Sequence, residues 1–164
     1  MKKSILTLFF LMTATLVMAQ ETTANGLIKT YKGKTGAEYV HIPKTLMKLG
    51  YLAAKNDADD AKERQQAAII KKIDNITILS LEDCDAKTRQ QFARDAAKLK
   101  LTGYEELIKA NDEGEKVTIY LRQKGDSIRE LLLLAIDGDD TALIQINGNI
   151  KPEDIQTLVN MDFD

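Results

Sequence analysis

The feature that most limits what this chain can fold into is a series of apolar segments after Gly103, separated by turn-forming residues. In residues 117–122 apolar and polar side chains alternate, the pattern of a strand with one buried face. Residues 128–136 are almost continuously apolar, which predicts a central strand covered on both faces. Residues 104–110 and 142–147 supply two further strands. Strands that follow one another across short turns predict an antiparallel meander.

The first half of the chain is different, because helical patterns there alternate with strand patterns. Pro43 suits the first turn of a helix, in which Leu46, Leu49 and Ala53 form an apolar side. Asn147 to Asn149 carries turn residues and is expected to end the last strand. The remaining pattern predicts helices over 24–32, 61–72, 85–100 and 152–159, with strands over 37–42 and 73–81.

Together these elements predict one α+β domain over residues 20–164. We expect a mixed, mostly antiparallel sheet of about five or six strands, with helices packed mainly on one face. Residues 1–19 are excluded from it, because they have the pattern of a signal peptide. Lys2 and Lys3 precede an apolar stretch over 5–17, and the small residue Ala19 ends the segment. We therefore expect a periplasmic or secreted protein, with no membrane span after cleavage because the apolar stretch is too short.

Charge and composition argue against several classes of partner. Removing Lys2 and Lys3 lowers Lys+Arg from 23 to 21 against 25 acids, so the cleaved chain has a net charge of −4. The charges are interspersed, and no basic stripe marks a nucleic-acid surface. The chain also lacks Trp, and aromatic residues make up 5% of it, which disfavours base or sugar stacking.

Cys84 and His41 are the single cysteine and the single histidine of the chain. One cysteine excludes an intramolecular disulfide, and Cys84 is either a free, partly buried residue or half of an intermolecular bridge. A thiol enzyme using Cys84 and His41 is an alternative that requires the two side chains to meet in a cleft. Nothing in the local sequence marks either residue as activated. We therefore expect no catalytic residue.

The turn at residues 137–140 holds Asp137, Asp139 and Asp140, which raises the question of a divalent metal. A calcium loop of the EF-hand type needs acids at alternate positions, a glycine sixth and a carboxylate twelfth, and this stretch departs from that spacing. It connects two strands that must reverse direction within a few residues. We interpret it as a hairpin turn with at most weak attraction for a cation, and expect no metal and no cofactor.

The strand over 128–136 suggests an interaction surface. Leu131, Leu133 and Ala135 point to one face of it, and an equally apolar set of side chains points to the other. A chain this short has few helices to cover both faces, and an uncovered apolar strip would bind a partner. We expect a second copy of the chain or another envelope protein there. The alternative is that the N-terminal or C-terminal helix covers the strip.

Several motifs occur in an order that resembles a known family. They are Tyr39-Val40-His41-Ile42-Pro43-Lys44-Thr45-Leu46-Met47, Ile76-Thr77-Ile78-Leu79, Gly103-Tyr104-Glu105-Glu106-Leu107, Ile128-Arg129-Glu130-Leu131-Leu132-Leu133 and Ala142-Leu143-Ile144-Gln145-Ile146-Asn147-Gly148-Asn149-Ile150. The chain is similar to a family of exported Gram-negative proteins known as a domain of unknown function (four-two-five-two). The resemblance implies no activity and no site residue. Some members look like lipoproteins, a pattern from which Gln20 departs, and similar proteins encoded near sigma-factor genes imply a role in envelope stress.

The residues and the resemblance together favour a non-catalytic periplasmic binding or protein-interaction module. An envelope-stress regulatory partner is the first alternative, and the thiol enzyme is the second.

Overall fold

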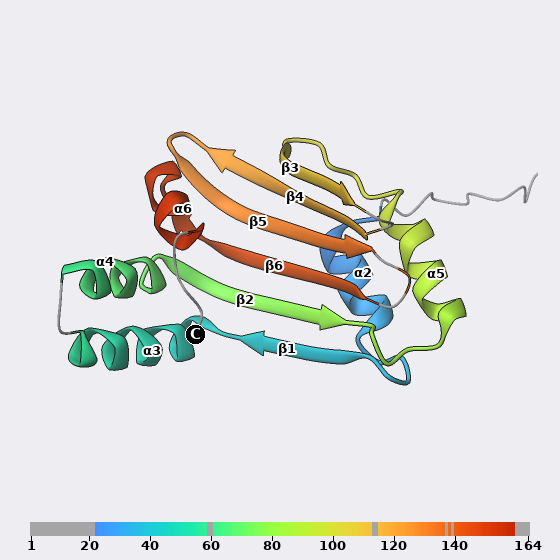
Figure 1. Ribbon diagram of the computed structural model, residues 1–164, viewed down its shortest axis with the longest axis horizontal. Coiled ribbons are helices and arrows are strands. Elements are labelled where there is room, and N and C mark those ends of the chain that lie inside the picture. The colour runs from blue at the N-terminus through green and yellow to red at the C-terminus, as the bar shows by residue number, and fades with distance from the viewer. Residues whose placement is uncertain (1–21, 59–60, 113–114, 137, 139, 160–164) are drawn as a thin grey trace, which may run out of the picture.

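The computed structural model describes residues 22–58, 61–112, 115–136, 138 and 140–159, in which one antiparallel sheet dominates (Figure 1). Six strands form it in the order β1-β2-β6-β5-β4-β3. The strands are β1 (Glu38–Ile42), β2 (Ile73–Ser80), β3 (Glu105–Asp112), β4 (Glu115–Lys124), β5 (Ser127–Ile136) and β6 (Thr141–Ile150). The helices are α2 (Ala24–Tyr31), α3 (Lys44–Asp57), α4 (Ala61–Ile70), α5 (Ala86–Ala96) and α6 (Pro152–Val159).

This arrangement confirms the predicted α+β fold and places the meander as expected. Strands β3 to β6 follow one another in space, and β2 closes onto the outer side of β6. The five neighbouring strand pairs are all antiparallel. The parallel contact that the structure records is an isolated bridge between Thr22 and Leu99, outside the strands. The sheet is therefore antiparallel rather than mixed.

The last strand is longer than expected, since β6 continues through the Asn-Gly-Asn segment to Ile150. Gly148 allows this because a Cβ atom there would lie 2.5 Å from the carbonyl oxygen of Lys72. The backbone N–H of Asn149 donates to the same oxygen at 2.8 Å. The Asn147 side chain donates to that of Asn75 at 2.9 Å. The turn-forming residues thus let another segment approach the strand closely and do not end it.

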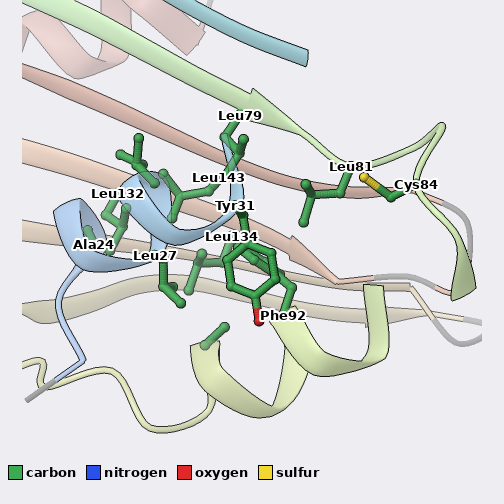
Figure 2. Packing of buried hydrophobic residues seen from close by; sticks show 12 residues of the cluster. Ala24, Leu27, Tyr31, Leu79, Leu81, Cys84, Phe92, Leu132, Leu134 and Leu143 are labelled. Carbon is green, nitrogen blue, oxygen red and sulfur yellow. The ribbon is translucent and has the colours of Figure 1, made fainter. Parts of the chain in front are cut away.

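One face of the sheet is covered by α2 and α5 (Figures 1 and 2). Leucines of the sheet meet Leu27 and Tyr31 of α2 and Phe92 of α5 in one buried cluster. The Tyr31 and Phe92 rings pack edge to face, with centroids 5.1 Å apart. Helix α5 begins where the Asp85 carboxylate accepts the backbone N–H of Thr88 at 2.8 Å, an N-cap that fixes the helix beside the strands.

The other helices form a second cluster at one end of the opposite face. Met47 of α3 is buried there, and Ile70 of α4 and Ile155 of α6 pack against the same cluster. The predicted apolar side of α3 is therefore wrong, because Leu46 and Leu49 are 52% and 61% exposed. The helix instead turns Met47 inward.

The Tyr31 hydroxyl predicts how stability responds to acid. It donates to Asp95 Oδ2 at 2.7 Å, and this hydrogen bond is the main reason why the pKa of Asp95 lies below its ordinary value of 3.8. A lowered carboxylate pKa stabilises the fold above the ordinary value, and that stabilisation is lost as the pH falls through the lowered one. In the Tyr31→Phe variant the free energy of unfolding should therefore fall less steeply as the pH is lowered below 4. Urea unfolding at several pH values measures this slope. Tyr39→Phe on β1 is the matched control, and equal slopes for the two variants would contradict the expectation.

Candidate interaction surface

One row of aliphatic side chains crosses all six strands on the face opposite α2 and α5. The register pairs each member with the next across the sheet, from β1 at one edge to β3 at the other. In spatial order the row is Val40, Ile78, Ile144, Leu133, Ile119 and Ile108. We call these six residues the open row. Such a row is apolar on every strand and contains no charged or polar member.

Two further rows flank it on the same face. The covered row lies toward the helical end and packs on the second cluster; it consists of Ile42, Ile76, Ile146, Leu131 and Leu121. The small-residue row lies toward the other end of the strands and consists of Ser80, Ala142, Ala135 and Val117, with the exposed Glu38 of β1 paired to Ser80 at its edge. We call the open row and the small-residue row together the open apolar face.

The open apolar face carries no helix among the residues that the structure describes, and Figure 1 looks onto it with α2 behind the strands. Its members belong to neither buried cluster. At the edges Val40 and Ile108 are 47% and 46% exposed, whereas the central side chains are half-buried because they pack side by side. Strand spacing and rise give the face a footprint of about 24 by 14 Å, or about 340 Å². Apolar patches of that size on a monomer are often functional.

The three residues predicted as an interaction surface all lie on this side of the sheet, one in each row. Leu131 is in the covered row, Leu133 in the open row and Ala135 in the small-residue row. The expectation that their strand is covered on both faces is wrong, because helices cover Leu132 and Leu134 but leave Leu133 and Ala135 half-buried. The role of the three residues in binding stays a prediction.

Charged side chains lie at both ends of the strands beside this face. At the far end from α3, exposed acids follow β2 and precede β6, namely Glu82, Asp83 and Asp140. At the helical end, exposed cations flank the sheet: Lys48, Lys71, Lys124 and Arg129. Both ends carry charges of both signs, because Arg89 donates to the Glu82 and Gly138 carbonyls at the first end, and Asp126 and Glu153 are exposed at the helical end.

Asp140, from the acidic turn that the sequence offers as a possible metal loop, lies at the same end of the sheet as Glu82. Asp140 is exposed there, while Asp137 and Asp139 lie outside the described residues. In the part of the chain that the structure describes, His, Cys, Asp and Glu side chains form no group of three able to hold a metal ion. Asp140 lies in the connection between β5 and β6 and directly precedes the first residue of β6.

Sequence reasoning missed an ion pair on the face that α2 and α5 cover, in which Glu130 is buried and Arg122 is exposed. The Glu130 carboxylate, 3% exposed, accepts hydrogen bonds from Arg122 Nη2 at 2.5 Å and from Gln145 Nε2 at 2.7 Å. The Arg122 guanidinium lies 5.6 Å from the centre of the Tyr104 ring. Burial, reinforced by the hydrogen bond with Glu130, raises the pKa of Tyr104 to about 12. The signal was the cross-strand pairing of Arg122 with Glu130, which requires the register of β4 and β5 to be known.

The structure does not bring Cys84 and His41 together. Cys84 is buried in the cluster under α5, where burial and the Asp85 charge raise the pKa of its thiol. The His41 ring lies 3.0 Å from the Thr77 hydroxyl, a distance that joins Nδ1 and Oγ1. The extended chain of β2 covers about 13 Å between Thr77 and Leu81. The Leu81 carbonyl accepts a hydrogen bond from the backbone N–H of Cys84. The pair therefore lacks the contact of about 3 Å that a nucleophile and its base require.

Comparison with known proteins adds one match. A family model described as a domain of unknown function (DUF4252) matches residues 31–158, which is more than half of the chain. No curated protein and no solved structure matches. Among the described residues, no helix is both long enough and apolar enough to cross a membrane.

Proposed function

This chain belongs to the family of the domain of unknown function DUF4252, and on that premise we propose that it is a non-catalytic protein-interaction module. Its binding surface is the open apolar face, which holds two of the three residues predicted from the sequence, Leu133 and Ala135. The module acts in the periplasm or after secretion, in keeping with the signal-peptide pattern of residues 1–19.

The observation that carries this proposal is the open row, six aliphatic residues wide and, among the residues that the structure describes, free of helix. At about 25 cal/mol per Å², leaving about 340 Å² of apolar surface in water forgoes on the order of 8 kcal/mol. That is comparable to the whole stability of a typical domain, about 5–15 kcal/mol. A partner that covers the open row accounts for this apolar surface on every strand of the sheet.

The polar groups support a non-catalytic role. Cys84 is buried in the cluster with Phe92, whereas the His41 ring contacts Thr77, and the buried Glu130 carboxylate is held by Arg122 and Gln145. An acid–base pair for catalysis needs groups that converge on a substrate within hydrogen-bond reach. The arrangement of the described side chains favours structural roles for each of these residues.

Site-specific photo-crosslinking in cells tests the proposal. A photoreactive amino acid replaces Ile119, the open-row residue of β4, and in a second strain it replaces Arg94, which is exposed on α5. We expect crosslinked products at position 119, to a second copy or to another protein, and none at position 94. Folding of both variants is checked by circular dichroism. Absence of any product at 119, or equal products at both positions, would contradict the proposal.

A further inference from the structure

We infer that the outward side of α3 binds the surface of a lipid bilayer that carries anionic lipids. The inference concerns a different surface from the open apolar face and goes beyond the proposed function. It starts from a side of α3 that the sequence predicts to be apolar and that the structure leaves exposed. Figure 1 shows α3 and α4 side by side, extending beyond the end of the sheet. Helix α3 therefore lies at the periphery of the molecule.

Three leucines form an exposed stripe on α3. Leu46, Leu49 and Leu52 are 52%, 61% and 51% exposed. They are spaced three residues apart, so they lie within about 120° of one another around the helix. Met47 is buried in the second cluster and lies nearly opposite the middle of the stripe, which fixes the side that faces the molecule. These three residues, the leucine stripe, therefore mark the outer side of α3.

Lysines line one flank of the leucine stripe. Lys44, Lys48 and Lys55 fall within about 40° of one another, about 120° around the helix from the middle of the stripe. The Lys71 ammonium group joins this flank, because it lies 5.7 Å from the centre of the Tyr51 ring. All four lysines are exposed. Their alkyl chains are long enough to place the charges beside the leucines.

The acids near α3 do not cancel this charge. Lys44 Nζ lies 2.5 Å from Asp74 Oδ1, so these two charges neutralise each other. Asp57 is exposed in the last turn of α3, on the flank away from the lysines. Among the residues that the structure describes, Lys48 and Lys55 form no ion pair. Residues 44–71 contain six Lys or Arg and four Asp or Glu, a net charge of +2.

Composition favours a bilayer over a protein as the occupant. The cores of protein interfaces are enriched in aromatic residues and arginine and depleted in lysine, and leucine is under-represented among their hot spots. Helices that lie on membrane surfaces instead combine leucines with adjacent lysines. The leucines enter the boundary of the acyl chains, while the lysines reach the lipid phosphates. The leucine stripe and its lysine flank have this second composition.

The local charge also sets the strength of binding, since the cleaved chain as a whole has a net charge of −4. At about 0.1 M salt, charges are screened over about 10 Å, so acids in other parts of the molecule contribute little. Each lysine at an anionic surface strengthens binding by roughly fivefold. We therefore expect reversible binding that requires anionic lipid and is weakened by salt.

Vesicle flotation of residues 20–164 tests the inference. This chain contains every described element, and it omits the apolar segment over 5–17, which would itself enter a bilayer. The vesicles consist of phosphatidylethanolamine with one-quarter phosphatidylglycerol, and vesicles of phosphatidylcholine are the neutral comparison. The unmodified chain should float with the anionic vesicles and stay behind with the neutral ones. Raising the salt to about 0.5 M should reduce flotation.

Two double variants test the two parts of the surface. Leu46→Gln with Leu49→Gln removes apolar contact, and Lys48→Glu with Lys55→Glu replaces attraction by repulsion. Each should lower the partition coefficient by about tenfold or more. All four positions are exposed, and circular dichroism checks that both variants fold.

Matched controls carry the same changes elsewhere. Leu107→Gln alters a leucine that is 46% exposed on β3, and Lys29→Glu with Lys87→Glu reverses two exposed lysines of α2 and α5. Both should float as the unmodified chain does. Leu133→Gln in the open row should float as well, because α3 and not that row meets the bilayer.

Three outcomes overturn the inference. The first is an unmodified chain that does not float; protein adducts from a photoreactive residue at position 49 in cells would then show that the stripe binds a protein. The second is equal flotation of the α3 variants and their controls. The third is loss of flotation in Leu133→Gln alone, which would place the bilayer on the open apolar face. The crosslinks at position 119 test the proposed function separately.

Discussion

Leu134→Lys is expected to leave the chain unfolded, whereas Leu133→Lys, one residue away, is expected to fold with nearly unchanged stability. Leu134 is 5% exposed and lies in the cluster formed by α2, α5 and the sheet. Burying an unpaired ammonium there costs several kcal/mol, a large part of the 5–15 kcal/mol that a domain has. Leu133 points to the open apolar face, where its replacement keeps the charge in water, and we expect a cost of about 1 kcal/mol or less.

Guanidinium unfolding followed by circular dichroism measures both variants, and each serves as the control for the other because strand and substitution are the same. Leu133→Lys should also lose the crosslinked products at position 119, since a charge then lies in the centre of the open row. If Leu133→Lys unfolds as Leu134→Lys does, some part of the chain covers the open row and the interaction surface does not exist.

Phe92→Ala should lower the free energy of unfolding by about 3–5 kcal/mol, the usual cost of removing a large buried ring and leaving a cavity. The ring is fully buried and packs edge to face on Tyr31, which adds a contact that aliphatic residues do not make. Phe92→Leu retains part of the volume and should cost clearly less. Urea unfolding of the three proteins measures the difference. A loss below about 1 kcal/mol for Phe92→Ala would mean that α5 does not pack on the sheet as described.

The sequence was sufficient to predict the elements and their order, because their signals are local. Alternation predicted β4, with Val117, Ile119 and Leu121 on one face, and Asp85 marked the start of α5. Turn-forming residues after Gly103 separated the strands of the meander. These features need no knowledge of distant contacts, so pattern and propensity were enough.

What could not be predicted depends on contacts between distant segments. Leu46 and Leu49 formed a reasonable apolar side for α3, but the position of α4 and the sheet decides which side turns inward. Gly148 is typical of a strand end, and its place within β6 depends on the close approach of the Lys72 backbone, which is distant in sequence. Glu130 interrupted an apolar run for no local reason, and its ion pair with Arg122 depends on register. The candidate surface was predicted in part, since the strip containing Leu133 was visible while the row across six strands was not.

The measurement that tests the central claim most directly is paramagnetic relaxation of isoleucine methyl groups by a soluble gadolinium chelate, recorded by NMR on dilute protein. The claim is that the helices of this chain leave the open row in water. We predict strong relaxation of the methyl groups of Ile78, Ile119 and Ile144, and protection of those of Ile128 and Ile150, which are buried. Methyl groups of the open row that are as protected as the buried ones at every dilution would contradict the account.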